Sequence, residues 1–234
     1  MNEQKPERLR PTSPTLDVHS IFPTIQGEGP FVGQPCVFVR LAGCNLQCPF
    51  CDTAYTEGRA EMTVETIIFD VAEASIIPTM SKDRPLVVIT GGEPFRQDLE
   101  ELVVGLTHIG YDVQIETNGT LAATLVTMSL ATIVCSPKTP KLNKELVPYV
   151  DAFKYVIEAG KVDPATGLPL HVLGATYGVG VPTEELAAGV KVYVQAMDSY
   201  DEKRNAANLA ATLKSVMTFG HTLCLQTQKI INVD

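Results

Sequence analysis

Short, mostly apolar runs recur along the chain, and segments with apolar residues at helical spacing separate most of them. Apolar runs that end at glycine, proline or polar residues predict buried strands. Six or seven strands are predicted, at residues 36–41, 85–90, 113–116, 132–135, 153–157, 190–195 and 222–226. Apolar positions three and four residues apart predict amphipathic helices near residues 64–72, 98–108, 121–128 and 202–217.

The order of these elements predicts the class of fold. Strands and helices alternate without the turn signals of hairpins, which favours an α/β fold with a parallel sheet and helical crossovers. Six or seven strands are fewer than the eight strands of a closed barrel. In the last predicted helix, we expect Leu209, Leu213 and Val216 to face inward.

The N-terminus and one long loop complete the predicted organisation. Residues 1–16 combine prolines with charged residues, which predicts a mobile N-terminal arm ahead of a single domain over residues 17–234. Residues 160–182 are rich in glycine and proline, which predicts a long loop. A loop of this length suggests a function, such as closing over a substrate.

Composition and charge narrow the class of function. The 234 residues carry a formal net charge of −9 and no basic cluster, which argues against direct nucleic-acid binding. No apolar run reaches membrane-spanning length and the N-terminus lacks the apolar core of a signal peptide, so we expect a cytoplasmic protein without membrane contact. Six cysteines in a reducing compartment favour metal ligation or catalysis over disulfides.

Half of these cysteines are close together in the sequence. Cys44, Cys48 and Cys51 have the spacing CxxxCxxC, and thiolates are soft ligands that suit zinc and iron–sulfur clusters. Zinc and fully protein-ligated clusters usually take four protein ligands, yet Cys36 and Cys135 lie in apolar runs and are predicted to be buried. Three ligands on a [4Fe–4S] cluster would leave one iron open to a small molecule. The alternatives are a zinc knuckle with a distant fourth ligand and a chance grouping.

Polar and glycine-rich motifs follow several predicted strands. They are GGEP at residues 91–94, ETNG at residues 116–119, SPK at residues 136–138, and Gln195. Because the carboxyl ends of parallel strands meet at one edge of a sheet, we expect these motifs to lie together. Glycine lets a backbone approach a ligand closely, and a carboxylate such as that of Glu93 accepts hydrogen bonds from an ammonium group. Each motif alone also fits ordinary turn chemistry.

Arg40 interrupts the apolar run at residues 36–41 with a charge. A cation in such a strand needs a partner. The partner is either a structural carboxylate or an acidic group of a ligand, because the guanidinium fork fits two carboxylate oxygens.

The cysteine spacing and the GGEP motif together resemble the radical S-adenosylmethionine (SAM) superfamily, in which SAM chelates the open iron of a [4Fe–4S] cluster. Further motifs resemble the 7-carboxy-7-deazaguanine synthase family. They are IQGEG at residues 25–29, CDT at residues 51–53, SPK at residues 136–138, VQAMD at residues 194–198 and LQTQK at residues 225–229. This resemblance extends from about residue 18 to the C-terminus.

The resemblance implies a fold, a reaction and partners. The fold would be a shortened, partial TIM-like barrel of about six parallel strands. The reaction would convert 6-carboxy-5,6,7,8-tetrahydropterin to 7-carboxy-7-deazaguanine with loss of ammonia, in queuosine and 7-deazapurine biosynthesis. The implied cofactors are a [4Fe–4S] cluster, SAM and Mg²⁺. The implied partners are the pterin substrate, an electron donor such as flavodoxin or ferredoxin, and a second copy in a homodimer.

The resemblance also assigns residues, motif by motif. Cys44, Cys48 and Cys51 would ligate the cluster, and Thr53 would give an oxygen to Mg²⁺, which prefers oxygen ligands. SAM would be bound by Phe50, Cys51, Asp52, Gly92, Glu93, Glu116, Asn118, Ser136, Pro137, Lys138 and Gln195. The substrate would be bound by Ile25, Gln26, Gly27, Arg40, Thr90 and Asp234. The radical comes from SAM, so no catalytic side chain is assigned, and Glu28 is a weaker candidate in the substrate pocket.

Two positions depart from the family. Ala196 stands where the family often has proline, and the chain ends in Asp234 where the family often ends in Gly-Ile-Pro, so a terminal carboxylate here brings an extra charge. A glycyl-radical activating enzyme shares the cysteine spacing, but Thr53 and the QGEG motif argue against it. An electron-transfer or zinc-binding module without catalysis is a third interpretation, against which the three-cysteine count and the GGEP motif argue.

Overall fold

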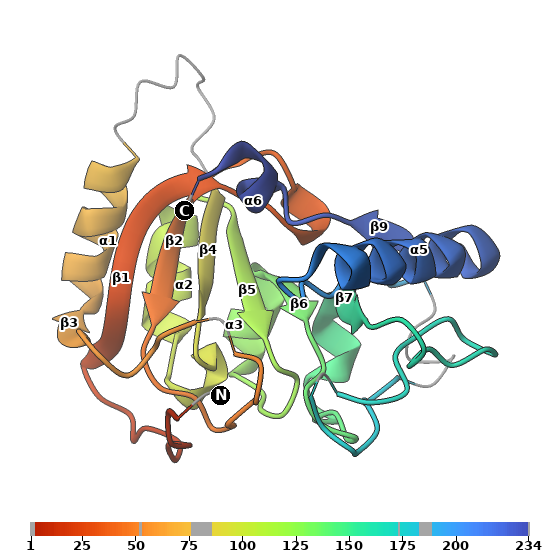
Figure 1. The fold of residues 1–234 in the computed structure, drawn as a ribbon. Coiled ribbons are helices and arrows are strands. Elements are labelled where there is room, and N and C mark those ends of the chain that lie inside the picture. Colours follow the sequence, from red (N-terminus) through yellow and green to blue (C-terminus); the bar gives the residue numbers. More distant parts are fainter. Residues whose placement is uncertain (1–2, 52, 76–85, 173, 183–188, 234) are drawn as a thin grey trace.

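One nine-stranded sheet organises the molecule (Figure 1). The structure is a computed structural model that describes residues 3–51, 53–75, 86–172, 174–182 and 189–233. The strands are β1 (Thr15–Ile25), β2 (Pro35–Leu41), β3 (Ala60–Thr63), β4 (Leu86–Gly91), β5 (Val113–Thr117), β6 (Thr132–Cys135), β7 (Val150–Ile157), β8 (Lys191–Ala196) and β9 (Thr222–Cys224). The helices are α1 (Val64–Ala74), α2 (Glu100–His108), α3 (Leu125–Leu130), α5 (Glu202–Phe219) and α6 (Thr227–Ile231), with 3-10 turns η1 (Gly29–Phe31), η2 (Pro94–Arg96) and η3 (Val147–Tyr149).

The strands follow the order β3-β1-β2-β4-β5-β6-β7-β8-β9 across the sheet. The neighbours from β2 to β9 in this order are all parallel. These parallel strands are the apolar runs of the sequence, so the predicted parallel sheet with helical crossovers is confirmed. The sheet does not close on itself, because β3 and β9 form its two edges. This is the partial TIM-like barrel that was predicted.

The long strand β1 and the short strand β3 are not predicted by the apolar pattern. β1 pairs antiparallel with β2 over most of its length but with β3 only at Thr15–Val18. Pro23 therefore lies where β1 has a strand neighbour on one side only, a position in which a sheet tolerates proline. A proline in a short run is normally a sign against a strand, which is why β1 escapes prediction. β1 also includes Thr15 and Leu16, which the prediction placed in the N-terminal arm.

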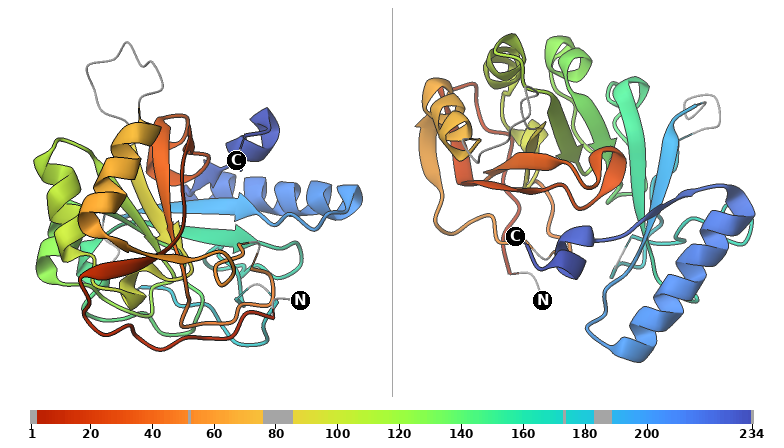
Figure 2. Two further views of the ribbon diagram at one scale, coloured as in Figure 1. Left: turned by 90° about the vertical axis from the view of Figure 1, so that its left-hand side faces the viewer. Right: turned by 90° about the horizontal axis from the view of Figure 1, so that it is seen from above.

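Helices α1, α2 and α3 cover one face of the sheet, and α6 lies on the other side (Figure 2). The main core fills the space between these helices and the strands. Its fully buried side chains include Ile67 of α1, Leu102 and Leu106 of α2, and Ile89 and Ile115 of the central strands. The apolar face that each helix presents to the sheet fixes the strands, and with them the loops at their carboxyl ends.

Leu102 gives a test of this core. Its side chain is fully buried in α2, so Leu102→Ala is expected to lower the free energy of unfolding by about 2–5 kcal/mol through lost apolar contact and a residual cavity. Val104 lies in the same helix and is 40% exposed, so Val104→Ala is expected to change that free energy by less than about 0.5 kcal/mol. Urea unfolding followed by circular dichroism measures both. Equal losses in the two variants would contradict this placement of α2.

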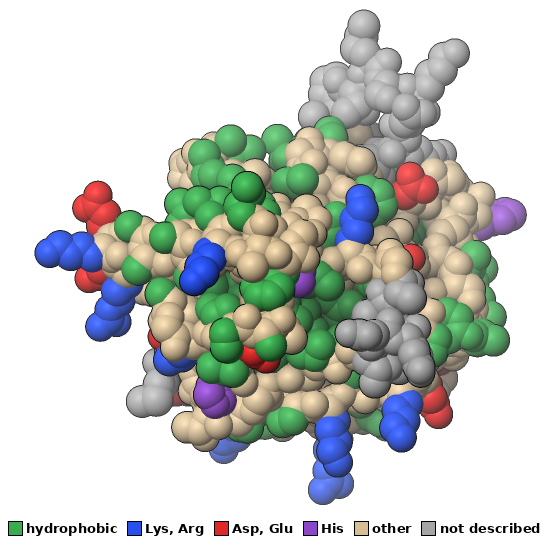
Figure 3. Space-filling model, turned by 90° about the vertical axis from the view of Figure 1, so that its right-hand side faces the viewer, with side chains coloured by type: hydrophobic (Ala, Val, Ile, Leu, Met, Phe, Trp, Pro, Cys, Tyr) green, Lys and Arg blue, Asp and Glu red, His purple; other side chains and the backbone are tan. Residues whose placement is uncertain are grey.

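Helix α5 packs with its polar face. Asn208, Thr212 and Ser215 are buried, whereas Leu209 is 39% and Leu213 is 42% exposed. The prediction that these two leucines face inward is therefore wrong, whereas Val216, predicted with them, is partly buried and packs against the main core. Figure 3 shows hydrophobic side chains exposed on the side of the molecule that carries α5.

The buried polar side chains of α5 bind backbone groups of neighbouring loops. Asn208 Oδ1 accepts a hydrogen bond from the Ala159 amide at 2.8 Å, and Asn208 Nδ2 donates to the Met197 carbonyl at 2.8 Å. Ser215 Oγ donates to the Gly167 carbonyl at 2.6 Å. Buried backbone groups must be hydrogen-bonded, so the loops after β7 and β8 select the polar face of α5.

Several predictions about segments remain untested. Residues 3–14 form neither helix nor strand, but mobility of the arm and the single domain over residues 17–234 stay predictions. In the loop at residues 160–182, Val162 bridges to Pro169 and Tyr155 Oη donates to the Gly180 carbonyl at 3.0 Å. A closing motion of this loop stays a prediction. Among the described residues, no helix has both the length and the apolar character needed to cross a bilayer.

Candidate active site

A cavity of about 540 Å³ lies at the carboxyl ends of the parallel strands. Strands β2 to β8 and the loops that follow them contribute Phe38, Arg40, Thr90, Glu116, Ser136, Lys138, Lys154, Val156 and Gln195 to its wall. The rest of the wall comes from the end of β1 and the loops after β1, β2 and β8, together with the C-terminal segment. These parts contribute Ile25, Gln26, Gly27, Glu28, Phe50, Cys51, Thr53, Met197, Asp198, Tyr200, Gln226, Gln228 and Lys229. We call this space the larger cavity.

A second cavity of about 210 Å³ surrounds the three neighbouring cysteines. Cys44, Cys48 and Cys51 line it together with Gly91 and Gly92. We call it the cysteine cavity. The two cavities have common wall residues, namely Phe50, Cys51, Thr90, Glu116, Ser136, Lys138 and Lys154. A ligand bound beside the cysteines would therefore adjoin a ligand in the larger cavity.

The two glycines of the GGEP motif let the turn after β4 approach the cysteine loop, the segment between β2 and β3. A Cβ atom on Gly92 would lie 1.9 Å from the Gly43 carbonyl oxygen, and one on Gly91 would lie 2.1 Å from that of Leu41. Gly91 also has a φ of +126°, which side chains other than glycine rarely allow. The Glu93 amide donates to the Gly43 carbonyl at 3.0 Å. These contacts fix the backbone one residue before Cys44.

The cysteine cavity holds its thiols in a weakly polar environment. Burial raises the pKa of Cys44 to about 12. Burial also raises the pKa of Cys48, and the nearby charge of Lys138 partly offsets this rise. Burial therefore disfavours the thiolate forms of Cys44 and Cys48, which a bound metal ion would favour. Among the described residues, no three Cys, His, Asp or Glu side chains are close enough together to hold one metal ion, while the cavity has room for a larger cofactor.

Arg40 lines the larger cavity next to Thr90, its neighbour in the register of β2 and β4. Its guanidinium carbon lies 5.2 Å from the centre of the Phe22 ring, and its buried Nε has no hydrogen-bond partner among the described residues. No described carboxylate forms an ion pair with Arg40. A half-buried guanidinium in a cavity wall is suited to bind the carboxylate of a ligand.

Comparison with known proteins identifies the family. Residues 39–167 match the radical SAM superfamily. The 7-carboxy-7-deazaguanine synthase of Rhodospirillum rubrum is 42% identical over 229 residues, which cover 94% of this chain and 93% of the relative. The chain belongs to the 7-carboxy-7-deazaguanine synthase family. The synthase of Rickettsia prowazekii is 38% identical over 224 residues, with 94% of this chain and 89% of the relative covered. The crystal structure of QueE from Escherichia coli has the same fold, with a TM-score of 0.65 at 20% identity over 90% of this chain and 93% of that one.

Membership of the radical SAM superfamily implies a [4Fe–4S] cluster and SAM. Most residues that the sequence assigned to SAM line the cysteine cavity, namely Phe50, Cys51, Gly92, Glu116, Asn118, Ser136 and Lys138. Gln195 lines the larger cavity instead, and Glu93 and Pro137 line neither of the two. Asp52 lies outside the described residues.

Glu93 supports the site from inside the protein. Its carboxylate is fully buried and accepts hydrogen bonds from Thr117 Oγ1 at 2.7 Å, the Asn118 amide at 2.7 Å and the Phe95 amide at 3.1 Å. Burial raises the pKa of Glu93 to about 7, against the lowering effect of these donors. Through these hydrogen bonds Glu93 holds the turn after β5 in place. The predicted contact between Glu93 and SAM stays a prediction.

Asn118 and Glu116 also have protein partners. Asn118 Nδ2 donates to Asn45 Oδ1 at 3.0 Å, which links the turn after β5 to the cysteine loop. Glu116 Oε1 accepts hydrogen bonds from Gln26 Nε2 at 3.1 Å and Gln114 Nε2 at 3.0 Å. Gln26, assigned to the substrate, is thus held by a residue assigned to SAM.

The residues assigned to the substrate lie together. Ile25, Gln26, Gly27, Arg40 and Thr90 all line the larger cavity, as do Glu28 and Thr53. Asp234 lies outside the described residues. The loop that carries Gly27 is held by the C-terminal segment, because the Thr227 amide and hydroxyl donate to the Gly27 carbonyl at 3.2 and 3.0 Å.

Lys154 is a wall residue of both cavities that sequence reasoning missed. It forms a buried ion pair with Glu28, whose Oε1 also accepts hydrogen bonds from Gln226 at 3.0 Å and Gln228 at 3.3 Å. The sequence does contain a signal: Lys154 interrupts an apolar strand, as Arg40 does. The two residues differ in their partners, since Lys154 pairs with the carboxylate of Glu28 within the protein.

The ion pair gives a pH-dependent prediction. Burial by itself raises the pKa of Glu28, but Lys154 and the glutamine donors lower it below its usual value of 4.5. The stabilising contribution of Glu28 is therefore present above pH 4.5 and is lost as the pH falls through the lowered pKa. At pH 7, Glu28→Gln is expected to reduce the free energy of unfolding by about 1–3 kcal/mol, because Lys154 loses its ion-pair partner. The nearby Glu116 still supplies part of the counter-charge.

Urea unfolding at several pH values measures this contribution. The control is Glu145→Gln, which removes the same charge from an exposed position and is expected to change the free energy of unfolding by less than about 0.5 kcal/mol. A difference between wild type and Glu28→Gln that does not shrink at acid pH would contradict the ion-pair account.

Proposed function

We propose that this chain converts 6-carboxy-5,6,7,8-tetrahydropterin to 7-carboxy-7-deazaguanine with loss of ammonia, as a radical SAM enzyme of queuosine and 7-deazapurine biosynthesis. The observation that carries the proposal is the pair of adjoining cavities with a common wall. One presents three thiols, and the other presents a guanidinium that pairs with no carboxylate of the described residues. The names of the relatives support the same activity.

The cysteine cavity would hold the cofactors. Cys44, Cys48 and Cys51 would ligate the cluster, and Gly92 would present its backbone to the methionyl end of SAM. When bound, the cluster and SAM supply the radical that takes a hydrogen atom from the substrate. Lys138 Nζ donates to Ser136 Oγ at 2.6 Å and to the Ser136 carbonyl at 3.0 Å, so this pair would form a polar edge beside SAM.

The larger cavity would hold the pterin. Arg40 would bind the substrate carboxylate, and Gln26, held by Glu116, would orient the polar ring edge. Thr53 lines this cavity, and its hydroxyl would serve as a Mg²⁺ ligand, with substrate and water completing the coordination.

We also propose a homodimer and a flavodoxin or ferredoxin as the electron donor. The exposed residues Leu209, Leu213 and Met217 of α5 support a partner surface, since an apolar stripe of this kind is favourable to bury. Light scattering of the purified protein measures the dimer. The rate at which flavodoxin or ferredoxin reduces the cluster tests the proposed electron donor.

The proposed activity is tested by anaerobic reconstitution with iron and sulfide. We expect iron and sulfide to be retained and the carboxylated pterin to be converted in the presence of SAM, Mg²⁺ and a reductant. Cys48→Ser is expected to lose both iron and turnover, while the control Cys36→Ala, at a buried cysteine that lines neither cavity, is expected to retain them. Zinc in place of iron would overturn the proposal. SAM cleavage with the pterin unchanged would favour an activating enzyme that acts on a protein.

A further inference from the structure

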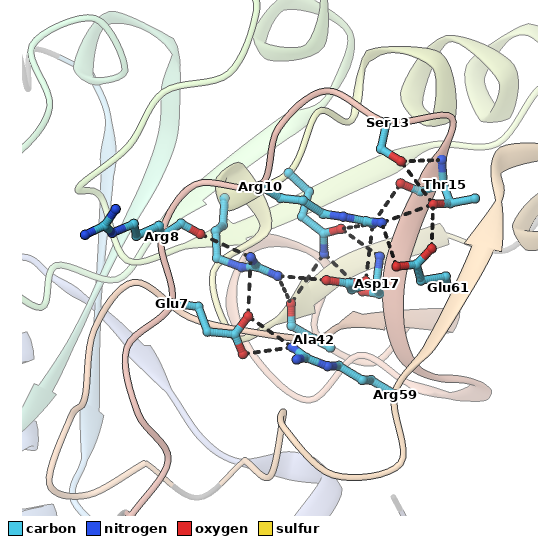
Figure 4. A network of polar contacts seen from close by, with 11 residues as sticks. Glu7, Arg8, Arg10, Ser13, Thr15, Asp17, Ala42, Arg59 and Glu61 are labelled. Carbon is cyan, nitrogen blue, oxygen red and sulfur yellow. Dashed lines mark hydrogen bonds and ion pairs between the residues drawn. The ribbon is translucent and has the colours of Figure 1, made fainter.

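The N-terminal segment contacts both turns that carry the cysteine and GGEP motifs. Residues 3–10 form neither helix nor strand, and we call them the N-terminal strap. Figure 4 shows Glu7, Arg8 and Arg10 of this strap in a network of polar contacts around Ala42 and Arg59. A segment whose composition predicts mobility therefore has specific partners in the segments that carry the cysteine and GGEP motifs.

Gln4 binds the chain just after the third cysteine. Its Nε2 donates to the Thr53 carbonyl at 2.9 Å, and its Oε1 accepts hydrogen bonds from the Tyr55 amide at 2.6 Å and the Thr56 hydroxyl at 3.1 Å. One side-chain amide thus satisfies a backbone acceptor and a backbone donor two residues apart, much as a neighbouring strand would. The residue held in this way, Thr53, lines the larger cavity.

Glu7 binds the other end of the cysteine loop. Its backbone amide donates to the Cys44 carbonyl at 2.7 Å. Its carboxylate accepts hydrogen bonds from Arg59 Nη1 at 2.8 and 3.0 Å and pairs with Arg96 Nη1 at 3.4 Å. The strap therefore spans the loop from its first cysteine to the residues that follow its third.

Arg96 connects the strap to the GGEP turn. It ends η2, which begins at the proline of the motif, and is 4% exposed. Its guanidinium donates to the Arg8 carbonyl at 3.2 Å and the Ala42 carbonyl at 3.0 Å, and its own carbonyl accepts from the Arg10 amide at 2.8 Å. A buried guanidinium shared in this way couples the position of the strap to both turns.

The cysteine loop needs such outside contacts. Its described residues contain neither helix nor strand between the end of β2 and the start of β3. A long segment without regular structure samples many conformations unless other parts of the protein restrict it. Mg²⁺ demands near-ideal geometry from its ligands, so a small displacement of Thr53 would weaken a metal bound there.

We propose that the N-terminal strap positions the cysteine loop and that Gln4 is a positioning residue for Thr53. The inference rests on the proposed function, because it treats Thr53 as a Mg²⁺ ligand and the loop as the carrier of the cluster. The strap acts from outside both cavities, since neither cavity is lined by any of its residues.

Three variants of the full chain test this role. Gln4→Ala removes all three hydrogen bonds, and Gln4→Glu keeps the acceptor for Tyr55 while losing the donor to Thr53. Lys5→Ala is the matched control, because Lys5 is exposed on the same strap. Hydrogen–deuterium exchange of the peptide over residues 53–56 is measured before and after reconstitution. The Mg²⁺ concentration for half-maximal turnover and the unfolding midpoint are measured in parallel.

We expect Gln4→Ala to increase exchange in this peptide by about tenfold, as for the loss of one or two hydrogen bonds. In Gln4→Ala and Gln4→Glu the Mg²⁺ requirement is expected to rise by about tenfold or more, the effect typical of a lost supporting contact around a metal ligand. Lys5→Ala is expected to change neither quantity by more than about twofold, and all unfolding midpoints are expected to stay within about 2 °C of wild type.

Two outcomes would overturn the inference. Unchanged exchange in Gln4→Ala would show that the strap does not restrict the loop. Increased exchange with an unchanged Mg²⁺ requirement would show that the restriction does not reach the metal ligand. If wild type itself retains no iron or needs no Mg²⁺, the proposed function fails instead, and the exchange data still decide whether the strap holds the loop.

Discussion

Gly92→Ala is expected to reduce turnover by about 100-fold or more, with less iron retained after reconstitution. The added Cβ atom would lie 1.9 Å from the Gly43 carbonyl oxygen, so either the GGEP turn or the cysteine loop must move. Both are backbone segments with little freedom, since Glu93 also donates to Gly43 at 3.0 Å. A displacement of about 1 Å between reacting groups is enough to cost this much rate.

The control for this prediction is Gly178→Ala in the loop at residues 160–182. Its Cβ atom would lie 3.7 Å from the Leu170 carbonyl, an ordinary contact distance. Iron analysis, turnover and circular dichroism of both variants separate a local effect from unfolding. A Gly92→Ala protein with the iron content and turnover of wild type would contradict the close contact between the two turns.

Arg40→Gln is the second change with a large expected effect. It keeps a polar side chain but removes the only charge that β2 contributes to the larger cavity. We expect kcat/KM for the carboxylated pterin to fall by on the order of 100-fold, because a charged partner of a desolvated carboxylate is lost. The kcat/KM of Arg40→Lys is expected to lie between those of wild type and Arg40→Gln, since an ammonium keeps the charge without the two-pronged geometry of a guanidinium.

A pterin that lacks the carboxylate provides the matched comparison. We expect it to bind wild type much more weakly than the substrate does, as measured by its inhibition constant. This inhibition constant is expected to change little in Arg40→Gln. The outcome against the account is an equal loss of affinity for both compounds. That result would assign Arg40 a structural role, such as its contact with the Phe22 ring.

The parallel sheet was predictable because its strands are buried on both faces and appear as continuous apolar runs. β1 was not, because it lies toward one edge of the sheet, mixes polar residues with apolar ones and contains Pro23. The orientation of α5 also escaped prediction. Its inward face is chosen by the unpaired backbone groups of distant loops, to which Asn208 and Ser215 donate or accept hydrogen bonds, and no local pattern records these groups.

The residues of the candidate site likewise divide into those that the sequence could predict and those that it could not. Residues at strand ends, such as Thr90 and Ser136, were found because topology alone brings strand ends together. The partners of charged residues were not, since Arg40 and Lys154 interrupt their strands alike and only the fold shows that Glu28 neutralises one of them. The contacts of the strap were not predicted for the same reason, while the mobility of the N-terminal arm stays a prediction. Composition describes the freedom of Gln4 and Glu7 but not the backbone groups that they reach.

The central claim is that a radical formed beside the three cysteines reacts with a substrate in the adjoining cavity. Isotope transfer tests it most directly, with the carboxylated pterin deuterated at C6 and supplied to the reconstituted enzyme with SAM, Mg²⁺ and a reductant. The account predicts deuterium at the 5′ position of 5′-deoxyadenosine or of recovered SAM, together with 7-carboxy-7-deazaguanine. Product formation without any deuterium in the adenosyl group would contradict it.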